Sequence, residues 1–251
     1  MRSGLRAKLS MRSAPKGSPE RCREEKQMDA IKISDLFDLT HTRAAEMLAA
    51  CTYPWEALGK IKAAVLTIGQ TLDPAAYEQT GEDVWIAKSA KIAPTATITG
   101  PCIIGENTEV RPGAFLRGSI LVGDGCVVGN STELKNCILF DGVQVPHYNY
   151  VGDSILGHLA HMGAGAVTSN VKGDKRPVVV HGESEYETGC RKFGAMLGDR
   201  AEIGCNSVLN PGTVIGRDSQ VYPLSSVRGV VPAHSIVKGE RGVFAKRDSN
   251  A

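Results

Sequence analysis

Aromatic side chains are scarce in this chain of 251 residues. Phe, Trp and Tyr make up only 5% of it, whereas Gly alone accounts for 28 residues. A core of this kind must be built from small aliphatic side chains, and abundant Gly favours short strands joined by tight turns. Net charge is also nearly absent, at +2, so the charge balance gives no reason to expect a nucleic acid partner.

Long apolar runs and paired cysteines are missing as well. No window approaches 18 consecutive apolar residues, which excludes an ordinary membrane-spanning helix. The seven cysteines are odd in number and form no C-x-x-C spacing. This usage favours reduced thiols and a cytoplasmic location over a disulfide framework.

The N-terminal part divides into two segments. Residues 1–27 hold eight Lys or Arg and four Ser but no apolar run suited to a secretory signal, and we interpret them as a disordered tail or an upstream start. Residues 28–80 are predicted to be helical, because Leu, Ile and Ala recur there at three- and four-residue spacing. We expect this helical segment to cover one end of the domain that follows.

From Ile86 onward the apolar residues recur at every sixth position. Small residues usually follow four places later, and the phase slips by two residues after Pro146. The large positions are Ile86, Ile92, Ile98, Ile104, Val110, Leu116, Val122, Val128, Leu134 and Phe140, then Leu156 and Met162, then Leu197, Ile203, Leu209, Ile215, Val221 and Val227.

A period of six fits neither a helix of 3.6 residues per turn nor a simple alternation of two. It is the repeat of a parallel β-helix, in which each six-residue unit supplies one short strand and one corner. The sequence therefore predicts a mainly β domain over residues 81–240, followed by a C-terminal tail over 241–251. Residues 171–191 interrupt the repeat, and we expect this irregular insertion to be a lid over the active site.

Six short motifs accompany the repeat: RPGA at 111–114, ELKN at 133–136, HYNYVGD at 147–153, GAG at 163–165, TSN at 168–170 and KF at 192–193. Together they resemble the hexapeptide-repeat acyltransferases. The resemblance is strongest to the acetyltransferase half of the bifunctional N-acetylglucosamine-1-phosphate uridyltransferase/glucosamine-1-phosphate acetyltransferases, over residues 86–240. The uridyltransferase half has no counterpart, since residues 1–80 contain no Gly-rich nucleotide loop.

The resemblance implies a single-stranded left-handed parallel β-helix with three hexapeptides per coil. It also implies a homotrimer with active sites between subunits, and acetyl-CoA or another acyl-CoA as co-substrate without a required metal. The expected activity is N- or O-acyl transfer to a sugar phosphate or a nucleotide-sugar related to UDP-N-acetylglucosamine, in the cytoplasm.

Site residues follow from the same resemblance. His147 matches the general base, a role that suits an imidazole titrating near neutral pH. Cationic side chains that hold an anionic acceptor form strong, directional bonds to phosphate. The residues expected around the acceptor are Arg111, Lys135, Tyr150, Asn170 and Lys192, and those expected around the cofactor are Ala164, Cys205, Pro223 and Lys238.

The spacing of the motifs singles out a second arginine. In the family, the motif Arg and Lys are 18 residues apart, which is one full coil. Here Arg111 and Lys135 are 24 apart, whereas Arg117 and Lys135 are 18 apart. The register argument therefore favours Arg117 as the phosphate ligand and makes Arg111 a corner residue, while the motif favours Arg111.

Two other functions remain open. A hexapeptide-repeat assembly subunit would keep the groove without turnover. A metal-dependent lyase of the carbonic anhydrase kind is suggested by His158 and His161, three residues apart, although those enzymes use a different His spacing. The chain also departs from the family pattern at His161, where the family has Asn, and at Val171, where it has Tyr. The acceptor and the acyl group are therefore left undefined.

Overall fold

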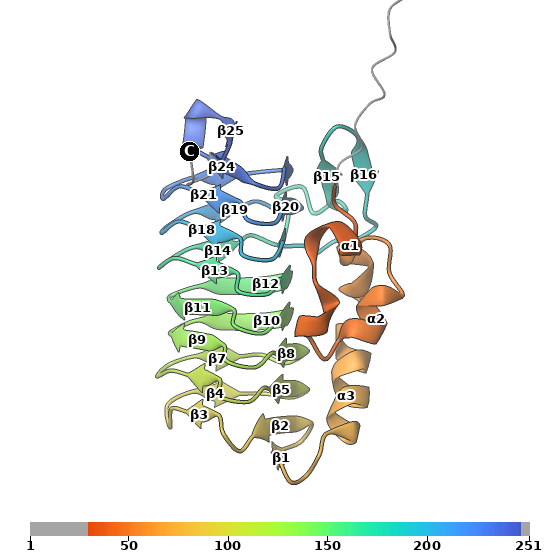
Figure 1. Cartoon of the computed structure of the whole chain (residues 1–251), viewed down its shortest axis with the longest axis vertical. Helices are drawn as coiled ribbons and strands as arrows, with labels where there is room; N and C mark the ends of the chain where they lie inside the picture. Colours follow the sequence, from red (N-terminus) through yellow and green to blue (C-terminus); the bar gives the residue numbers. More distant parts are fainter. Residues whose placement is uncertain (1–29, 247–251) are drawn as a thin grey trace, which may run out of the picture.

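The computed structural model describes residues 30–246, so the predicted tail at 1–27 and residues 247–251 of the one at 241–251 lie outside the described residues. The chain winds into a parallel β-helix whose coils stack along one axis (Figure 1). The prediction of a mainly β, parallel β-helix is confirmed. The architecture agrees with the left-handed form that the resemblance implies.

Each coil contributes strands to three faces, which we call the first, second and third face. The first face holds β2 (Val84–Ala87), β5 (Cys102–Ile104), β8 (Ile120–Val122), β17 (Ala195–Leu197), β20 (Thr213–Ile215) and β23 (Val230–Val231). The second face holds β3 (Lys91–Ile92), β6 (Glu109–Val110), β9 (Val127–Asn130), β11 (Gln144–His147), β13 (His161–Met162), β18 (Glu202–Ile203), β21 (Gln220–Val221) and β24 (Ser235–Val237).

The third face holds β4 (Thr97–Ile98), β7 (Phe115–Leu116), β14 (Val167–Thr168), β19 (Val208–Leu209) and β22 (Ser226–Val227). Two long strands, β10 (Glu133–Leu139) and β12 (Tyr150–Leu156), begin on the third face and continue onto the first. Antiparallel strands close both ends of the solenoid: β1 (Tyr77–Gly81) pairs with β2, and β25 (Val243–Ala245) pairs with β24. Such closure satisfies strand edges that would otherwise be exposed.

The six-residue repeat becomes a ladder inside the solenoid. Large aliphatic residues stack in register, as Leu116 does on Leu134, and the small residues fill the corners beside them. The Thr108 hydroxyl donates to the carbonyl of Gly123 at 2.8 Å and accepts from the amide of Cys126 at 3.0 Å. Buried Thr and Ser at this position thus satisfy polar backbone groups that the corners would leave unpaired.

The predicted phase of the repeat is wrong at one place. The sequence predicted a single slip of two residues after Pro146, but the structure has two slips of one residue, after Leu134 and after Val151. Leu139, not Phe140, pairs with Val122 in the interior series. Both slips occur where β10 and β12 pass through a corner without a break, because a continuous strand needs one residue fewer there.

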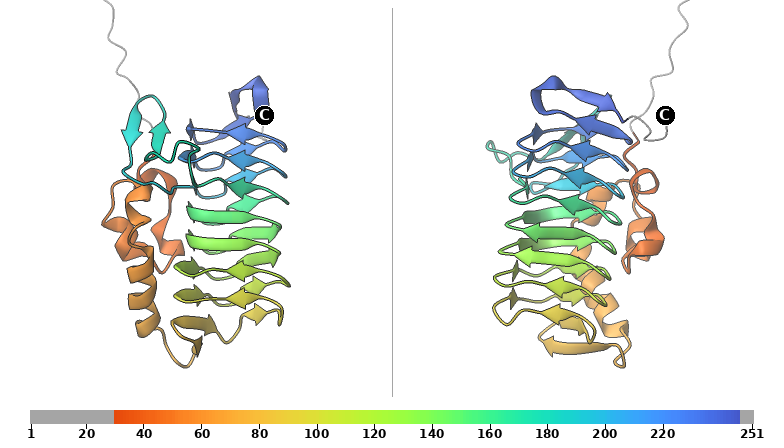
Figure 2. Two further views of the ribbon diagram at one scale, coloured as in Figure 1. Left: turned by 180° about the vertical axis from the view of Figure 1, so that it is seen from behind. Right: turned by 60° about the vertical axis from the view of Figure 1, so that its left-hand side comes forward.

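Helices lie beside the first face rather than over an end (Figures 1 and 2). They are α1 (Ile33–Leu36), η1 (Leu39–His41), α2 (Ala45–Ala49), η2 (Pro54–Ala57) and α3 (Ile61–Thr71), with a short η3 (Gly239–Arg241) near the C-terminus. The expectation that the helical segment covers an end is therefore wrong. At a rise of 1.5 Å per residue, α3 spans about 16 Å, or roughly three coils, so its apolar side covers β5, β8 and β10 together. No helix among the described residues is long and apolar enough to cross a membrane.

The insertion is not the irregular loop that the sequence predicted. It forms an antiparallel hairpin of β15 (Val179–His181) and β16 (Glu185–Glu187). The hairpin packs on the helical segment, where the Trp55 ring lies 6.2 Å from that of Tyr186 and 6.0 Å from that of Phe193. The insertion is therefore an ordered hairpin that the helical segment supports.

Candidate active site

Lys135 and Arg117 lie on neighbouring coils of the third face. Leu116 pairs with Leu134, and the amide of Arg117 donates to the carbonyl of Leu134 at 2.9 Å. Each cation directly follows its interior Leu, so both side chains leave the solenoid in the same direction. This is the placement that the register argument requires for these two residues.

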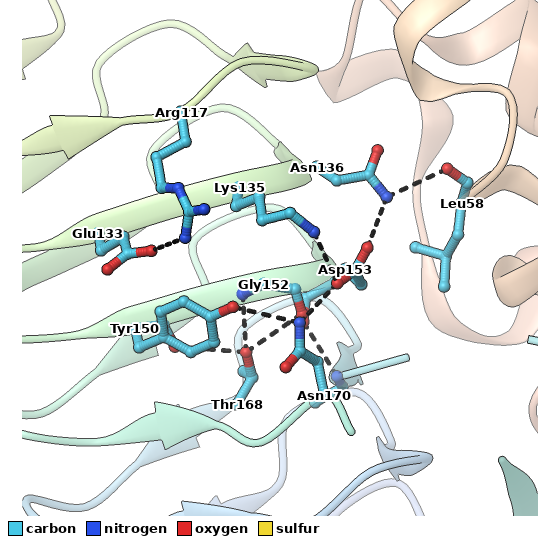
Figure 3. A network of polar contacts seen from close by, with 12 residues as sticks. Leu58, Arg117, Glu133, Lys135, Asn136, Tyr150, Gly152, Asp153, Thr168 and Asn170 are labelled. Carbon is cyan, nitrogen blue, oxygen red and sulfur yellow. Dashed lines mark hydrogen bonds and ion pairs between the residues drawn. The ribbon is translucent and has the colours of Figure 1, made fainter. Parts of the chain in front are cut away.

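A buried carboxylate organises the polar network around Lys135 (Figure 3). The Asp153 side chain is only 7% exposed and lies 3.4 Å from the Lys135 ammonium. It also accepts hydrogen bonds from the Asn136 amide at 2.9 Å and the Asn170 amide at 2.5 Å. Asn136 reaches the helical segment as well, donating to the carbonyl of Leu58 at 3.2 Å.

Tyr150 joins the same network through its hydroxyl, which accepts from the Asn170 amide at 3.1 Å. Burial raises the pKa of the Tyr150 hydroxyl, and the nearby carboxylates of Asp153 and Glu133 act in the same direction. The hydroxyl therefore stays protonated at neutral pH and can donate a hydrogen bond to a ligand.

Arg117 is held by Glu133, its neighbour on the next coil, at 2.6 Å. The hydrogen bond to Glu133 is the main reason that the pKa of the Arg117 guanidinium is raised. Arg111 instead directly follows β6 of the second face, and its guanidinium pairs with Glu109 of that strand at 3.1 Å. The structure thus separates the two arginines and brings only Arg117 to the face of Lys135.

His147 lies at the edge where the second and third faces meet, at the end of β11. Its amide donates to the Asn149 side chain at 3.1 Å. The buried Asn149 amide in turn donates to the carbonyls of Gly163 at 2.8 Å and Ala166 at 3.1 Å. The imidazole of His147 is exposed and has no hydrogen bond or ion pair within residues 30–246, so it is open to a ligand.

The residues expected at the cofactor follow one another along the edge that carries His147. The amide of Gly165 donates to the carbonyl of His147 at 3.0 Å. In the same way, the amide of Asn206 donates to the carbonyl of Ala164 at 2.8 Å, and the amide of Leu224 donates to that of Cys205 at 2.9 Å. These corners form one column along the edge, which continues to Pro223. Lys238 lies near the C-terminal end of the column, with its ammonium 5.6 Å from the ring centre of Tyr222.

Asp153, at the centre of the network, and His147 lie beyond opposite ends of the part of β12 that belongs to the third face. Gly152, which pairs with Lys135, comes five residues after His147. The chain turns a corner at Tyr148 and Asn149 between them, so the two positions are at most about 17 Å apart. Lys192 belongs to the network side, because its neighbour Phe193 donates a backbone hydrogen bond to Asn170 at 3.0 Å. Within residues 30–246, no hydrogen bond or ion pair joins the imidazole of His147 to the acceptor residues.

The sequence analysis did not single out four residues that hold this site in place: Glu133, Asn136, Asn149 and Asp153. All four lie within the ELKN and HYNYVGD motifs. Asn136 and Asp153 also have left-handed backbone conformations, with φ of 47° and 49°. Asn and Asp tolerate this conformation better than most residues, so their recurrence after an interior aliphatic was a usable signal.

The two histidines that suggested a metal have different partners. His158 stacks on His41 with ring centres 3.6 Å apart, and its Nδ1 lies 2.8 Å from the carbonyl of Asp141. His161 lies 2.8 Å from the Glu202 carboxylate. Within the part of the chain that the structure describes, no group of three or more His, Cys, Asp or Glu converges on one point.

Known proteins match this chain over the solenoid. A family model described as the GMPPB C-terminal domain matches residues 98–184. A bifunctional protein GlmU of Methanococcus aeolicus is 36% identical over 174 residues, which cover 62% of this chain and 42% of the relative. The uncharacterized acetyltransferase YaiX of Escherichia coli is 30% identical over 65% of this chain and 71% of its own length. The chain belongs to the hexapeptide-repeat acyltransferases.

Members of this family with a second activity are much longer than the matched part. The chain spans less than half the length of the first GlmU relatives, at 42% and 44%. A bifunctional sugar-1-phosphate nucleotidylyltransferase/acetyltransferase of Sulfurisphaera tokodaii is 33% identical over 78% of this chain and 54% of its own length.

Proposed function

We propose that the protein transfers an acyl group, most simply acetyl, from acyl-CoA to an amine or hydroxyl of a sugar phosphate or nucleotide-sugar. The observation that carries the proposal is the stacking of Arg117 and Lys135 on neighbouring coils beside Tyr150 and Asn170. Two cations on coils about 4.8 Å apart suit one phosphate, and the neutral Tyr150 hydroxyl and an amide suit the sugar. A relative named as a bifunctional sugar-1-phosphate nucleotidylyltransferase/acetyltransferase supports the same class of reaction.

In this reaction the acceptor nitrogen or oxygen attacks the thioester carbonyl carbon. The imidazole of His147 removes the proton from the acceptor as the new bond forms. The tetrahedral intermediate then collapses, the carbon–sulfur bond breaks, and the CoA thiolate takes a proton. His147 suits this role because its ring is exposed and unpaired while Asn149 fixes its backbone.

The active site would form between two copies of the chain. Within one chain, a corner separates His147 from the coil position beside Lys135, and no contact among the described residues links the two side chains. If the third face of one subunit meets the His147 edge of the next, base and phosphate ligands converge on one small acceptor. This arrangement fits a homotrimer, in which every subunit supplies both parts.

The direct test is release of free thiol from acetyl-CoA in the presence of a panel of amino sugars, sugar phosphates and nucleotide-sugars. His147→Ala should lower kcat by about 100-fold and leave the affinity for CoA unchanged. The matched control is His234→Ala, an exposed histidine of another corner, which should keep full activity. Full activity of His147→Ala would refute its role as the base.

A complementation experiment tests the shared site. His147→Ala and Lys135→Ala chains should each be nearly inactive alone. When they are co-expressed, mixed trimers contain interfaces with an intact His147 and an intact Lys135, so part of the activity should return. No recovery would show that both residues serve a site within one chain.

One observation favours the alternative of a non-catalytic assembly subunit. Both cations already have a carboxylate partner, Glu133 for Arg117 and Asp153 for Lys135. A phosphate must compete with these carboxylates, and a subunit that has lost turnover would show the same pairs. Thiol release with none of the acceptors, together with a correctly folded trimer, would support this alternative.

A further inference from the structure

A polar pocket of about 440 Å³ lies farther along the third face, toward the C-terminal coils. One wall is the start of the insertion, and the other is formed by corner residues of three successive coils. The lining residues are Ser169, Val171, Lys172, Gly173, Asp174, Asn210, Pro211 and Arg228. Neither the acceptor residues nor the cofactor residues predicted from the sequence line it.

The pocket continues the row of positions that begins with Arg117 and Lys135. Strand pairings place the next members in line: Gly152 beside Lys135, then Ser169, Asn210 and Arg228. The row has cations at both ends and small or uncharged residues between them. Four coil steps of about 4.8 Å put Arg228 roughly 19 Å from Lys135.

Arg228 differs from the other cations of the row because no carboxylate among the described residues pairs with it. Its one hydrogen-bonding contact is with Nε2 of His181, on β15 of the insertion, at 3.5 Å. Nδ1 of His181 lies 3.2 Å from the Glu185 carboxylate. In the tautomer with hydrogen on Nδ1, His181 donates to Glu185 and accepts from Arg228. The insertion thereby orients an otherwise free guanidinium at the pocket.

Lys172 supplies a second cation. Its ammonium lies 3.4 Å from the carboxylate of Asp174, which also lines the pocket, and 3.5 Å from the carbonyl of Pro177. The pocket thus holds two cations against one carboxylate. Ser169 adds a hydroxyl that makes no hydrogen bond within residues 30–246, so it is available as a donor.

We infer that this pocket binds a phosphate group at the far end of one of the two co-substrates, with Arg228 as its principal ligand and Lys172 as the second. The inference rests on the proposed function, because the row starts at the site proposed for the acceptor phosphate. A guanidinium without a carboxylate partner can bind phosphate through two parallel hydrogen bonds. Both CoA and the nucleotide part of a nucleotide-sugar carry phosphates far from their reacting ends.

The experiment measures binding by calorimetry with the full chain, so it does not depend on turnover. The probes are inorganic pyrophosphate, CoA and UDP, titrated into the unchanged protein and into Arg228→Ala. Arg176→Ala is the matched control, since Arg176 is another exposed arginine of the insertion and does not line the pocket. Arg228→Ala should weaken pyrophosphate binding by about 10-fold, and Arg176→Ala by less than about twofold.

The source of the phosphate follows from the other two probes. A selective loss of CoA affinity in Arg228→Ala assigns the pocket to the acyl donor, and a selective loss of UDP affinity assigns it to a nucleotide-linked acceptor. Unchanged binding of all three probes, or equal losses in Arg228→Ala and Arg176→Ala, would overturn the inference. A chain that releases no thiol but still loses pyrophosphate binding in Arg228→Ala would refute acyl transfer and leave the phosphate pocket standing.

Discussion

The second and third faces carry similar side chains at equivalent positions, yet only the third face joins them into a network. Arg111 and Arg117 each follow an interior aliphatic residue directly. On the next coil, the residue beside Arg117 is Lys135, whereas the residue beside Arg111 is Gly129. Residue type is therefore not enough in a stacked repeat: the neighbour one coil away decides whether a cation is part of a site.

The two faces also differ at their far corners. The third face ends where β10 and β12 turn through Asn136 and Asp153, and these residues tie the corner to the helical segment at Leu58. On the second face, the pair of His161 and Glu202 links only two side chains. The helical segment contacts the corner of this face with the first face instead, where Arg43 pairs with Asp124 at 2.8 Å. A connected, partly buried network holds its members in fixed positions, which a ligand site needs.

The largest expected difference between the faces concerns stability. Asp153→Asn keeps the shape and the tolerance for a left-handed backbone, but its amide cannot accept from both Asn136 and Asn170 or pair with Lys135. Loss of this buried acceptor should lower the free energy of unfolding by about 2–3 kcal/mol. Glu109→Gln removes the exposed partner of Arg111 and should cost less than about 0.5 kcal/mol. Urea unfolding of both variants measures the contrast, and equal losses would contradict it.

The next effect concerns the acceptor. Arg117→Ala should raise the KM for the acceptor by about 10-fold, because it removes one of two cations on the same phosphate, while Arg111→Ala should change it less than about twofold. Steady-state kinetics with the acceptor identified by thiol release provides the measurement. If Arg111→Ala raised the KM more than Arg117→Ala, the phosphate ligand would be the arginine of the RPGA motif and not the one that shares the face of Lys135. The second face would then contribute to the site.

The sequence predicts those features of the fold that repeat in every coil. The solenoid was predictable because each six-residue unit needs one large and one small residue in the interior, and this pattern recurs along the sequence. The separate faces of Arg111 and Arg117 followed from counting residues per coil. The two slips, after Leu134 and after Val151, were predicted as one slip after Pro146, since a strand that continues through a corner leaves no mark in the hydrophobic pattern.

Other features depended on contacts between distant segments. Phe140 fitted the six-residue phase, yet its ring lies 5.1 Å from that of Phe37, so the helical segment rather than the solenoid interior buries it. The position of that segment beside the first face depends on such tertiary packing. The central role of Asp153 likewise emerges only when it meets Lys135, Asn136 and Asn170, because these four residues come from three coils.

The smallest expected effect tests whether the insertion works as a lid for the third face. Replacing the hairpin tip, residues 182–184, with the two-residue turn Asn-Gly would keep Tyr186 on Trp55 but shift His181 away from Arg228. The KM of the co-substrate that uses the Arg228 pocket should rise by about threefold, with kcat unchanged, because the hairpin orients the Arg228 guanidinium and not the reacting groups. Ser184→Ala keeps the length of the hairpin and serves as the control. Size-exclusion chromatography should show the same oligomer for both variants. If the shortened hairpin instead dissociates the oligomer, the insertion serves assembly, and the third face owes its ligand contacts to the solenoid alone.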